Sequence, residues 1–178
     1  GIDPLAQAIS GLPSELGCRL GLVWPQNPSR WLKSLVRKYG ERILTFPTVP
    51  LGEVADYMAA ADIIAVPQLS TPQTAGQIPA KIMDAMAMGR PIIATSVSDI
   101  PSILTPDAGP EAGIVVPPGD VGALRKALHR AALHPEELSA MGRAARALFV
   151  ERYSNEAVFP KLAETLIPLM GVRGGEMG

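Results

Sequence analysis

The residues best suited to chemistry follow a short apolar run near the middle of the chain. A polar loop over residues 68–78, rich in Ser, Thr and Gln, leads into a helical pattern over residues 79–88. Lys81 and Asp84 are three positions apart in that pattern, so they share one face of the helix. The first turn of a helix offers unpaired N–H groups and the positive end of the helix dipole, which favour an anionic group such as phosphate. We therefore predict a site for a phosphate-bearing ligand where the loop meets the helix.

The neighbouring segments place this loop at the edge of a sheet. Residues 62–66 form an apolar run that predicts a buried strand, and residues 91–95 form another. Pro79 suits the first helical position because it has no N–H to leave unpaired, and Gly89 suits the residue just past the helix end. The order strand, loop, helix, strand puts the loop at the carboxyl end of the first strand, where ligands bind in open α/β sheets.

Strands and helices are expected to alternate through the rest of the chain. Strands are expected at 18–24, 42–46, 62–66, 91–95 and 112–116, and helices at 3–12, 29–39, 51–60, 79–88, 98–104, 121–133, 135–151 and 155–170. The core-facing side chains of two of these helices are expected to be Trp31, Leu32, Leu35 and Val36, and Ile78, Ile82, Ala85, Met86 and Met88. Such alternation, with near-continuous apolar strands, is typical of a parallel sheet covered on both faces. The predicted fold is therefore α/β, a Rossmann-like doubly wound parallel sheet with helices on both faces.

Composition narrows the classes of protein to which the chain can belong. Its 178 residues are 47% hydrophobic, enough for one substantial core. The net charge is −1 and aromatic residues make up only 4%, so no basic face for nucleic acid is indicated. No apolar run approaches the roughly 20 residues of a spanning helix. The single cysteine, Cys18, excludes a disulfide framework within the chain, fits a reducing compartment and is expected to pack in a strand.

The segment over residues 79–95 also carries a family pattern. It reads PxKxxDAMAxGxPIIAT and follows DYMAAADIIAVP, while RILTFPTVP, GIVVPPGDVGAL and ERYSNEAV lie at matching places along the chain. Together these segments resemble the C-terminal, nucleotide-sugar-binding domain of GT-B glycosyltransferases of the retaining group 1 class. In that class an acidic residue stands eight positions before the one matched by Asp84, and here that position holds Gly76.

The resemblance implies the donor-binding domain of a glycosyltransferase that moves a sugar from a nucleotide-diphosphate sugar to an acceptor. The implied donor-binding residues are Thr48, Val49, Gly76, Gln77, Ile78, Ala80, Lys81 and Asp84. Asp84 would accept hydrogen bonds from the ribose hydroxyls, because hydrogen bonds to a carboxylate are short and strong. Lys81 would meet phosphate, and backbone N–H groups from Gly76 to Ala80 would surround diphosphate or sugar oxygens.

Each of these residues also has an interpretation without a ligand. Asp84 fits a solvated carboxylate paired with Arg or Lys, and Lys81 fits a side chain that projects into water. The loop fits an ordinary connection, although its length favours a site. Val49 would give the base an apolar wall beside Thr48, or these residues simply form a turn between a strand and a helix. The two histidines are expected at the surface, since no His, Cys and carboxylate cluster has metal spacing.

The resemblance also implies a domain organisation. One nucleotide-sugar-binding domain would span residues 1–170, followed by a flexible Gly-rich tail over residues 171–178. The first strand of the domain, with phosphate-binding Arg and Lys, and an N-terminal acceptor-binding domain would precede Gly1. The catalytic groups are therefore expected partly outside these residues, which alone should transfer no sugar. No metal or other cofactor is expected.

The implied partners are a nucleotide sugar and an acceptor that is a carbohydrate, a lipid or a small molecule. No nucleic acid is expected, and any peripheral membrane association is expected only through the N-terminal domain. The implied location is cytoplasmic, including the inner face of the membrane. Because Gly76 replaces the acidic residue that contacts the transferred sugar, free nucleotide should bind about as well as sugar nucleotide.

Two other functions stay open. A non-catalytic nucleotide-binding or interaction module would use the same fold, because a fold does not fix a function, and Gly76 favours this alternative. A sugar-nucleotide epimerase on a related two-domain fold would need acid and base carboxylates that the sequence does not place. A full-length chain with an N-terminal α/β domain and a His or Asp at the cleft would favour the enzyme.

Overall fold

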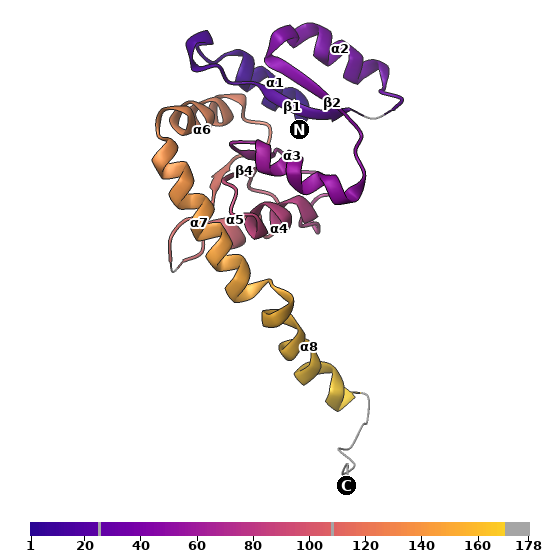
Figure 1. The fold of residues 1–178 in the computed structure, drawn as a ribbon, viewed down its shortest axis with the longest axis vertical. Coiled ribbons are helices and arrows are strands. Elements are labelled where there is room, and N and C mark those ends of the chain that lie inside the picture. The colour runs from indigo at the N-terminus through magenta and orange to yellow at the C-terminus, as the bar shows by residue number, and fades with distance from the viewer. Residues whose placement is uncertain (25, 108, 170–178) are drawn as a thin grey trace.

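The computed structural model describes residues 1–24, 26–107 and 109–169, and within them parallel strands alternate with helices (Figure 1). The strands are β1 (Leu20–Trp24), β2 (Ile43–Pro47), β3 (Ile64–Val66), β4 (Ile92–Thr95) and β5 (Ile114–Val116). The helices are α1 (Ile2–Ser10), α2 (Arg30–Tyr39), α3 (Val54–Ala60), α4 (Ala80–Ala87), α5 (Ile100–Leu104), α6 (Val121–Leu133), α7 (Pro135–Arg152) and α8 (Asn155–Leu169). Each expected strand and helix occurs, with small shifts at its ends.

The strands form two parallel sheets instead of one continuous sheet. β1 pairs with β2, from Leu20 opposite Ile43 to Trp24 opposite Pro47. β4 pairs with β3 on one side and with β5 on the other, which makes the second sheet. Among the described residues, no ladder joins β1 to β3. The expected α/β class, with parallel strands flanked by helices, is confirmed, but the described strands form two sheets where the sequence predicted one.

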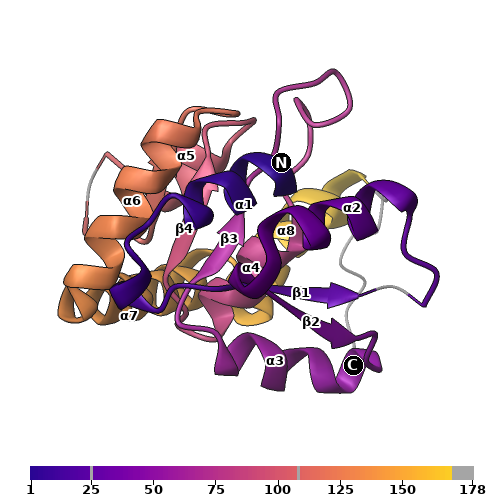
Figure 2. The ribbon, with the colours of Figure 1, turned by 90° about the horizontal axis from the view of Figure 1, so that it is seen from above.

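Helices cover both faces of the strands, and each face has its own buried core. α6, α1 and α2 lie side by side over one face (Figures 1 and 2), and α3 and α4 lie over the other. β4 separates the two cores: Ile93 packs with α1 and α6, whereas Ile92 and Ala94 pack with α4, α5 and α7. This division follows from the pleat of a strand, in which successive side chains point to opposite faces.

Helix α4 is fixed at both ends by local geometry. Gly89 has a φ of 63°, and the amides of Gly89 and the next residue donate to carbonyls of the last turn at 3.0 and 2.9 Å, which is the Schellman pattern. At the other end the helix begins at Ala80, because Pro79 is extended, with a ψ of 129°, and serves as the N-cap. The prediction for Gly89 is confirmed, and the prediction that Pro79 is the first helical residue is wrong by one position.

Helix α7 crosses the end of α4 at close range. A Cβ atom on Gly142 of α7 would lie 2.2 Å from the carbonyl oxygen of Gly89. A larger side chain at this position would push the two helices apart, which explains the glycine. α4 is therefore held against the body, with Ile82, Ala85 and Met86 each 0% exposed, as the helical spacing predicts.

The expected positions of Trp31 and Cys18 are wrong. Trp31, expected to face the core, is 52% exposed, because it lies on the flank of α2 while Leu35 occupies the buried face. Cys18, expected in a strand, precedes β1 and packs partly buried against the core, with its thiol 3.7 Å from the carbonyl oxygen of Leu16. Both side chains are apolar. Trp31 lies to the side of the buried face of its helix, and Cys18 lies before the start of its strand.

The last helix, α8, extends away from the body (Figure 1), and none of its residues is buried. The Gly-rich tail expected at residues 171–178 lies outside the described residues. Within the part of the chain that the structure describes, none of the helices combines the length and the apolarity that a membrane crossing needs.

Candidate functional site

The loop between β3 and α4 has its own internal order. The hydroxyl of Thr74 donates to the carbonyl oxygen of Leu69 at 2.6 Å and accepts from the amide of Thr71 at 2.9 Å. The amide of Ala75 donates back to the carbonyl oxygen of Thr71 at 3.0 Å, which closes a turn. These short-range bonds satisfy backbone groups without regular secondary structure. The loop thus presents a defined shape to solvent at the end of β3.

A second set of bonds joins the loop to the ends of β4 and β5. The hydroxyl of Thr95, which is 1% exposed, donates to the carbonyl oxygen of Gln68 at 2.7 Å. The amide of Ser96 donates to the carbonyl oxygen of Val116 at 2.8 Å. The carboxyl ends of these three strands are therefore fastened together beneath the loop. Sequence analysis missed Thr95, and the available signal was a hydroxyl residue that ends the apolar run of β4.

The start of α4 lies at this same edge. The amide of Ile82 donates to the carbonyl oxygen of Pro79 at 2.9 Å, and no side chain caps the helix. The amides of the first turn, at Ala80 and Lys81, have no carbonyl within the helix to receive them, because helical bonds run back toward the preceding turn. Both residues are exposed. The helix start therefore offers N–H groups to a ligand.

The structure brings Lys81 and Asp84 together on the solvent face of α4. Both are exposed, whereas Ile82, Ala85 and Met86 on the opposite face are buried. Among the described residues, neither Lys81 nor Asp84 takes part in a salt bridge. The exposure of Asp84 fits its interpretation as a solvated carboxylate, but the pairing with Arg or Lys that this interpretation included is absent among the described residues. Both side chains are therefore available to a ligand.

The residues just before α4 are also exposed, but they differ in whether their backbone groups are free to bind a ligand. A Cβ atom on Gly76 would meet nothing within 4 Å, and its backbone is not left-handed, so the fold does not require glycine there. The amide of Gln77 donates to the carbonyl oxygen of Thr74 at 3.2 Å, so this N–H, expected to face a ligand, is used inside the loop. Ile78 is 41% exposed and does not face the core as expected, because it precedes the helix.

Thr48 and Val49 lie in the other half of the molecule. They follow β2, which among the described strands pairs with β1 alone. Thr48 is exposed and Val49 is partly buried. Both residues follow the carboxyl end of their strand, as the predicted site requires, but among the described strands no ladder joins their sheet to β3. The expected base-binding turn and the α4 residues therefore belong to separate sheets.

The first residue of the chain lies beside the loop. The backbone of Gly1 lies against the carbonyl oxygen of Pro67, which leaves no room for a side chain at this position. Figure 2 shows the N-terminus and α1 next to the loop that follows β3. The starts of α1 and α4 thus lie near the same strand end, and both contribute positive dipole ends there.

Other parts of the surface hold no predicted site residue. A shallow hollow of about 600 Å³ is lined by Gly89, Arg143 and Val150, at the opposite end of α4 from the loop. His129 and His134 are exposed, as expected. Within the described ranges, no three His, Cys, Asp or Glu side chains gather in a group that could hold a metal ion.

Comparison with known proteins gives a consistent family signal. Residues 1–133 match the family model described as glycosyl transferases group 1. The chain is 29% identical over 160 residues to an MMP alpha-(1->4)-mannosyltransferase from Mycolicibacterium hassiacum, covering 89% of this chain and 37% of that protein. It is 32% identical over 111 residues to a D-inositol 3-phosphate glycosyltransferase from Xylanimonas cellulosilytica, covering 60% of this chain and 25% of that protein.

Solved structures are similar over nearly the whole chain. Sucrose-phosphate synthase from Thermosynechococcus elongatus superposes with a TM-score of 0.80 at 26% identity, covering 97% of this chain and 43% of that one. Anabaena HepE in complex with UDP gives 0.77 at 18% identity, covering 94% and 45%. The chain therefore spans less than half the length of each of these proteins.

Proposed function

The chain belongs to the group 1 glycosyl transferases, and from this we propose that it forms the donor-binding part of a retaining enzyme that transfers a sugar from a nucleotide-diphosphate sugar to an acceptor. The family that the motifs at residues 79–95 resemble is confirmed by the match over residues 1–133. The observation that carries the proposal is the unpaired couple Lys81 and Asp84 on the exposed face of α4, beside an ordered loop at the strand ends.

Each part of the donor has a matching group in this proposal. The N–H groups of Ala80 and Lys81 and the dipole of α4 face the diphosphate, and the Lys81 ammonium adds a mobile positive charge. Asp84 accepts hydrogen bonds from the ribose hydroxyls, and the base lies against the turn at Thr48 and Val49. In this proposal residues that follow strands of both sheets contact the donor, and the diphosphate lies nearest the start of α4.

The chemistry in this proposal is mainly electrostatic. The bond between the anomeric carbon and the diphosphate oxygen breaks, and its electron pair leaves with the diphosphate. The acceptor hydroxyl oxygen forms the new bond to the anomeric carbon, and its proton passes to the departing diphosphate oxygen. Oriented N–H groups stabilise the charge that builds on the leaving oxygen, because they need no reorganisation as the bond breaks. The likeness to HepE, whose structures contain UDP or UDP-glucose, supports a nucleotide sugar as the donor class.

Calorimetry with UDP, GDP and ADP tests the proposal on the Asp84→Asn variant. If Asp84 holds the ribose, the variant should bind the preferred nucleotide about 1.5–3 kcal/mol more weakly, the range for a hydrogen bond to a charged group. Asp62→Asn is the matched control, because Asp62 is exposed and precedes β3, at the opposite edge of the sheet. An unchanged dissociation constant for Asp84→Asn, or an equal loss in the control, would contradict the proposal.

A further inference from the structure

Helix α2 presents a purely basic face to solvent. Its sequence, RWLKSLVRKY, contains four basic residues and no acidic one. Arg30, Lys33, Arg37 and Lys38 are all exposed, while Leu35 is buried against the body. The apolar face of the helix packs on the core, as in most surface helices, but all the charged residues on its outer face are basic.

Helix α6 has the same character. Its sequence, VGALRKALHRAAL, contains Arg125, Lys126 and Arg130 and no acidic residue. A Cβ atom on Gly11 would lie 2.4 Å from Cζ of Arg125, so this guanidinium lies across the end of α1. A groove of about 350 Å³ runs between that end of α1 and the basic side chains of α6.

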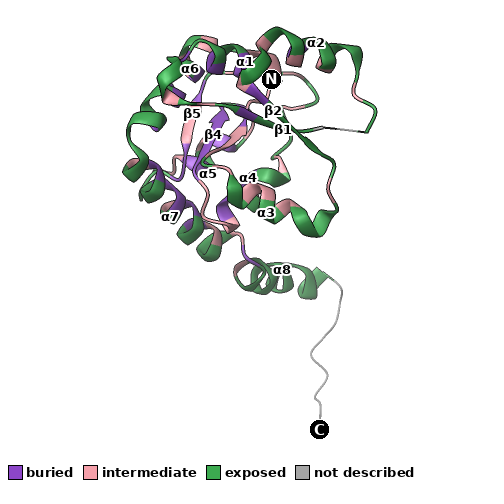
Figure 3. Cartoon of the chain, turned by 45° about the horizontal axis from the view of Figure 1, so that its top comes forward, coloured by how far each residue is buried: buried purple, intermediate pink, exposed green. Residues whose placement is uncertain are grey.

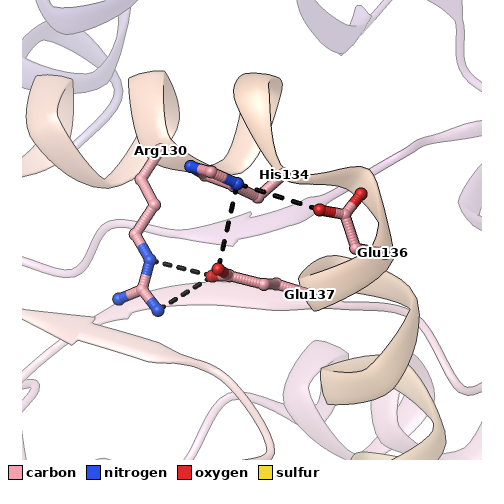
Figure 4. Close-up of polar contacts among 4 residues, drawn as sticks. All are labelled: Arg130, His134, Glu136 and Glu137. Atoms are coloured by element: carbon pink, nitrogen blue, oxygen red, sulfur yellow. Dashed lines mark hydrogen bonds and ion pairs between the residues drawn. The ribbon is translucent and has the colours of Figure 1, made fainter.

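One of the α6 charges is partly neutralised by the next helix. Figure 4 shows Arg130 bonded to Glu137, with N–O distances of 2.9 and 2.8 Å, and His134 close to Glu136 and Glu137. Arg125 and Lys126 lie one turn back, away from this pair. The positive charge of α6 is therefore concentrated toward α1 instead of toward α7.

The two basic helices belong to one layer of the molecule. α1 packs between α6 and α2, and the three helices lie side by side on one face in both views (Figures 1 and 2). The acidic residues at the margin of this layer include Asp3, which accepts from the Tyr39 hydroxyl at 3.2 Å, Glu15 and Glu41 in the turns after α1 and α2, and Asp120, whose carboxylate caps the start of α6. On the opposite face, α3 has Asp56 and neither Lys nor Arg. The α2–α1–α6 layer therefore carries more basic than acidic side chains, although the net charge of the chain is −1.

From this distribution we propose that the α2–α1–α6 layer docks on a membrane surface rich in anionic lipid. Such a surface attracts Lys and Arg within a Debye length, and each basic residue strengthens binding by about fivefold. Two large apolar side chains stand among the charges: Trp31 is 52% exposed on α2 and Leu133 is 51% exposed on α6. Trp beside Lys and Arg suits the boundary between headgroups and acyl chains.

The observations favour a membrane over nucleic acid. The layer is formed by three neighbouring helices, so its charges spread over a broad face instead of lining a single groove. A planar bilayer touches that face alone and leaves the strand ends and the α4 loop open to ligand. The proposal departs from the sequence-based expectation that only an N-terminal domain would contact a membrane, and it does not depend on the proposed function.

Co-sedimentation with vesicles tests the docking. Vesicles of phosphatidylcholine with about 30% phosphatidylglycerol should sediment the protein at about 0.1 M salt, and pure phosphatidylcholine vesicles should not. Replacing Arg30, Lys33, Arg37 and Lys38 with Gln should weaken the association on the order of 100-fold or more, from about fivefold per residue. The blue shift of Trp fluorescence on vesicle addition should be lost in Trp31→Phe.

The matched control removes the same net charge from α7 and α8, through Gln at Arg143, Arg146, Arg152 and Lys161. This variant should bind the vesicles as the parent does, and circular dichroism melts should show that both variants stay folded. The proposal is overturned if the protein ignores anionic vesicles, if both variants lose binding equally, or if only poly(U) RNA and no vesicle is bound. The last result would assign the layer to nucleic acid.

Discussion

The two sheets of this domain differ sharply in how well they are covered. All of β4 is buried, because side chains from α1 and α6 pack on one face and side chains from α4, α5 and α7 pack on the other. In β2 only the first residue, Ile43, is buried. Val23, Leu44 and Phe46 of the two-stranded sheet are 53%, 38% and 37% exposed. Figure 3 shows buried segments gathered around β4 and exposed segments along β1 and β2.

This difference separates a rigid half of the candidate site from a weakly supported half. The loop after β3 and the start of α4 are fastened to the buried sheet through Thr95, so they can hold their geometry without a ligand. The turn at Thr48 and Val49 stands on a two-stranded sheet that has little cover.

The largest expected effect of this difference is on stability. Ile93→Ala should lower the free energy of unfolding by about 2–5 kcal/mol, because Ile93 is 1% exposed and the surrounding core cannot fill the cavity. Leu44→Ala, the matched change in β2, should cost about 1 kcal/mol or less, because Leu44 is already 38% exposed. Urea titrations of the parent and both variants measure these two losses in the free energy of unfolding. Equal losses would mean that the two sheets share one core and that the difference in cover has no energetic consequence.

A smaller effect is expected at Gly76, within the rigid half. Gly76→Glu should change the free energy of unfolding by less than about 0.5 kcal/mol, since its side chain would enter open space. If the acidic group of the family contacts the transferred sugar, the variant should prefer sugar nucleotide over free nucleotide by about 1 kcal/mol, one new hydrogen bond. The parent should bind both about equally.

Competition binding with UDP and UDP-glucose measures this preference, and Ala140→Glu on α7 adds the same charge at an exposed position elsewhere. An unchanged preference in Gly76→Glu, together with a retained fold, would favour the non-catalytic module, because the site would then lack a place for the sugar.

The sequence predicted features that depend on neighbouring residues, and it missed those that depend on distant ones. The apolar run of β4 and the helix stop at Gly89 are local patterns, and both are confirmed. The division into two sheets depends on which strands pair, which composition and periodicity do not specify. Trp31 is exposed because it lies on the flank of α2, away from the face that Leu35 buries, and Thr95 matters because of a bond to Gln68, 27 residues away in the chain. The exposure of Asp84 was predictable from its spacing in α4, since it stands opposite the buried face.

The most direct test of the central claim is a map of where a nucleotide binds. Amide shifts of the ¹⁵N-labelled chain are followed as UDP is added, with uridine as the control that lacks the diphosphate. The account predicts shifts over residues 76–84 and at Thr48 and Val49, and it predicts that uridine leaves Ala80 and Lys81 unshifted. Shifts that map to α6 and spare both segments would contradict it, because the ligand would then lie on the basic layer and not at the strand ends.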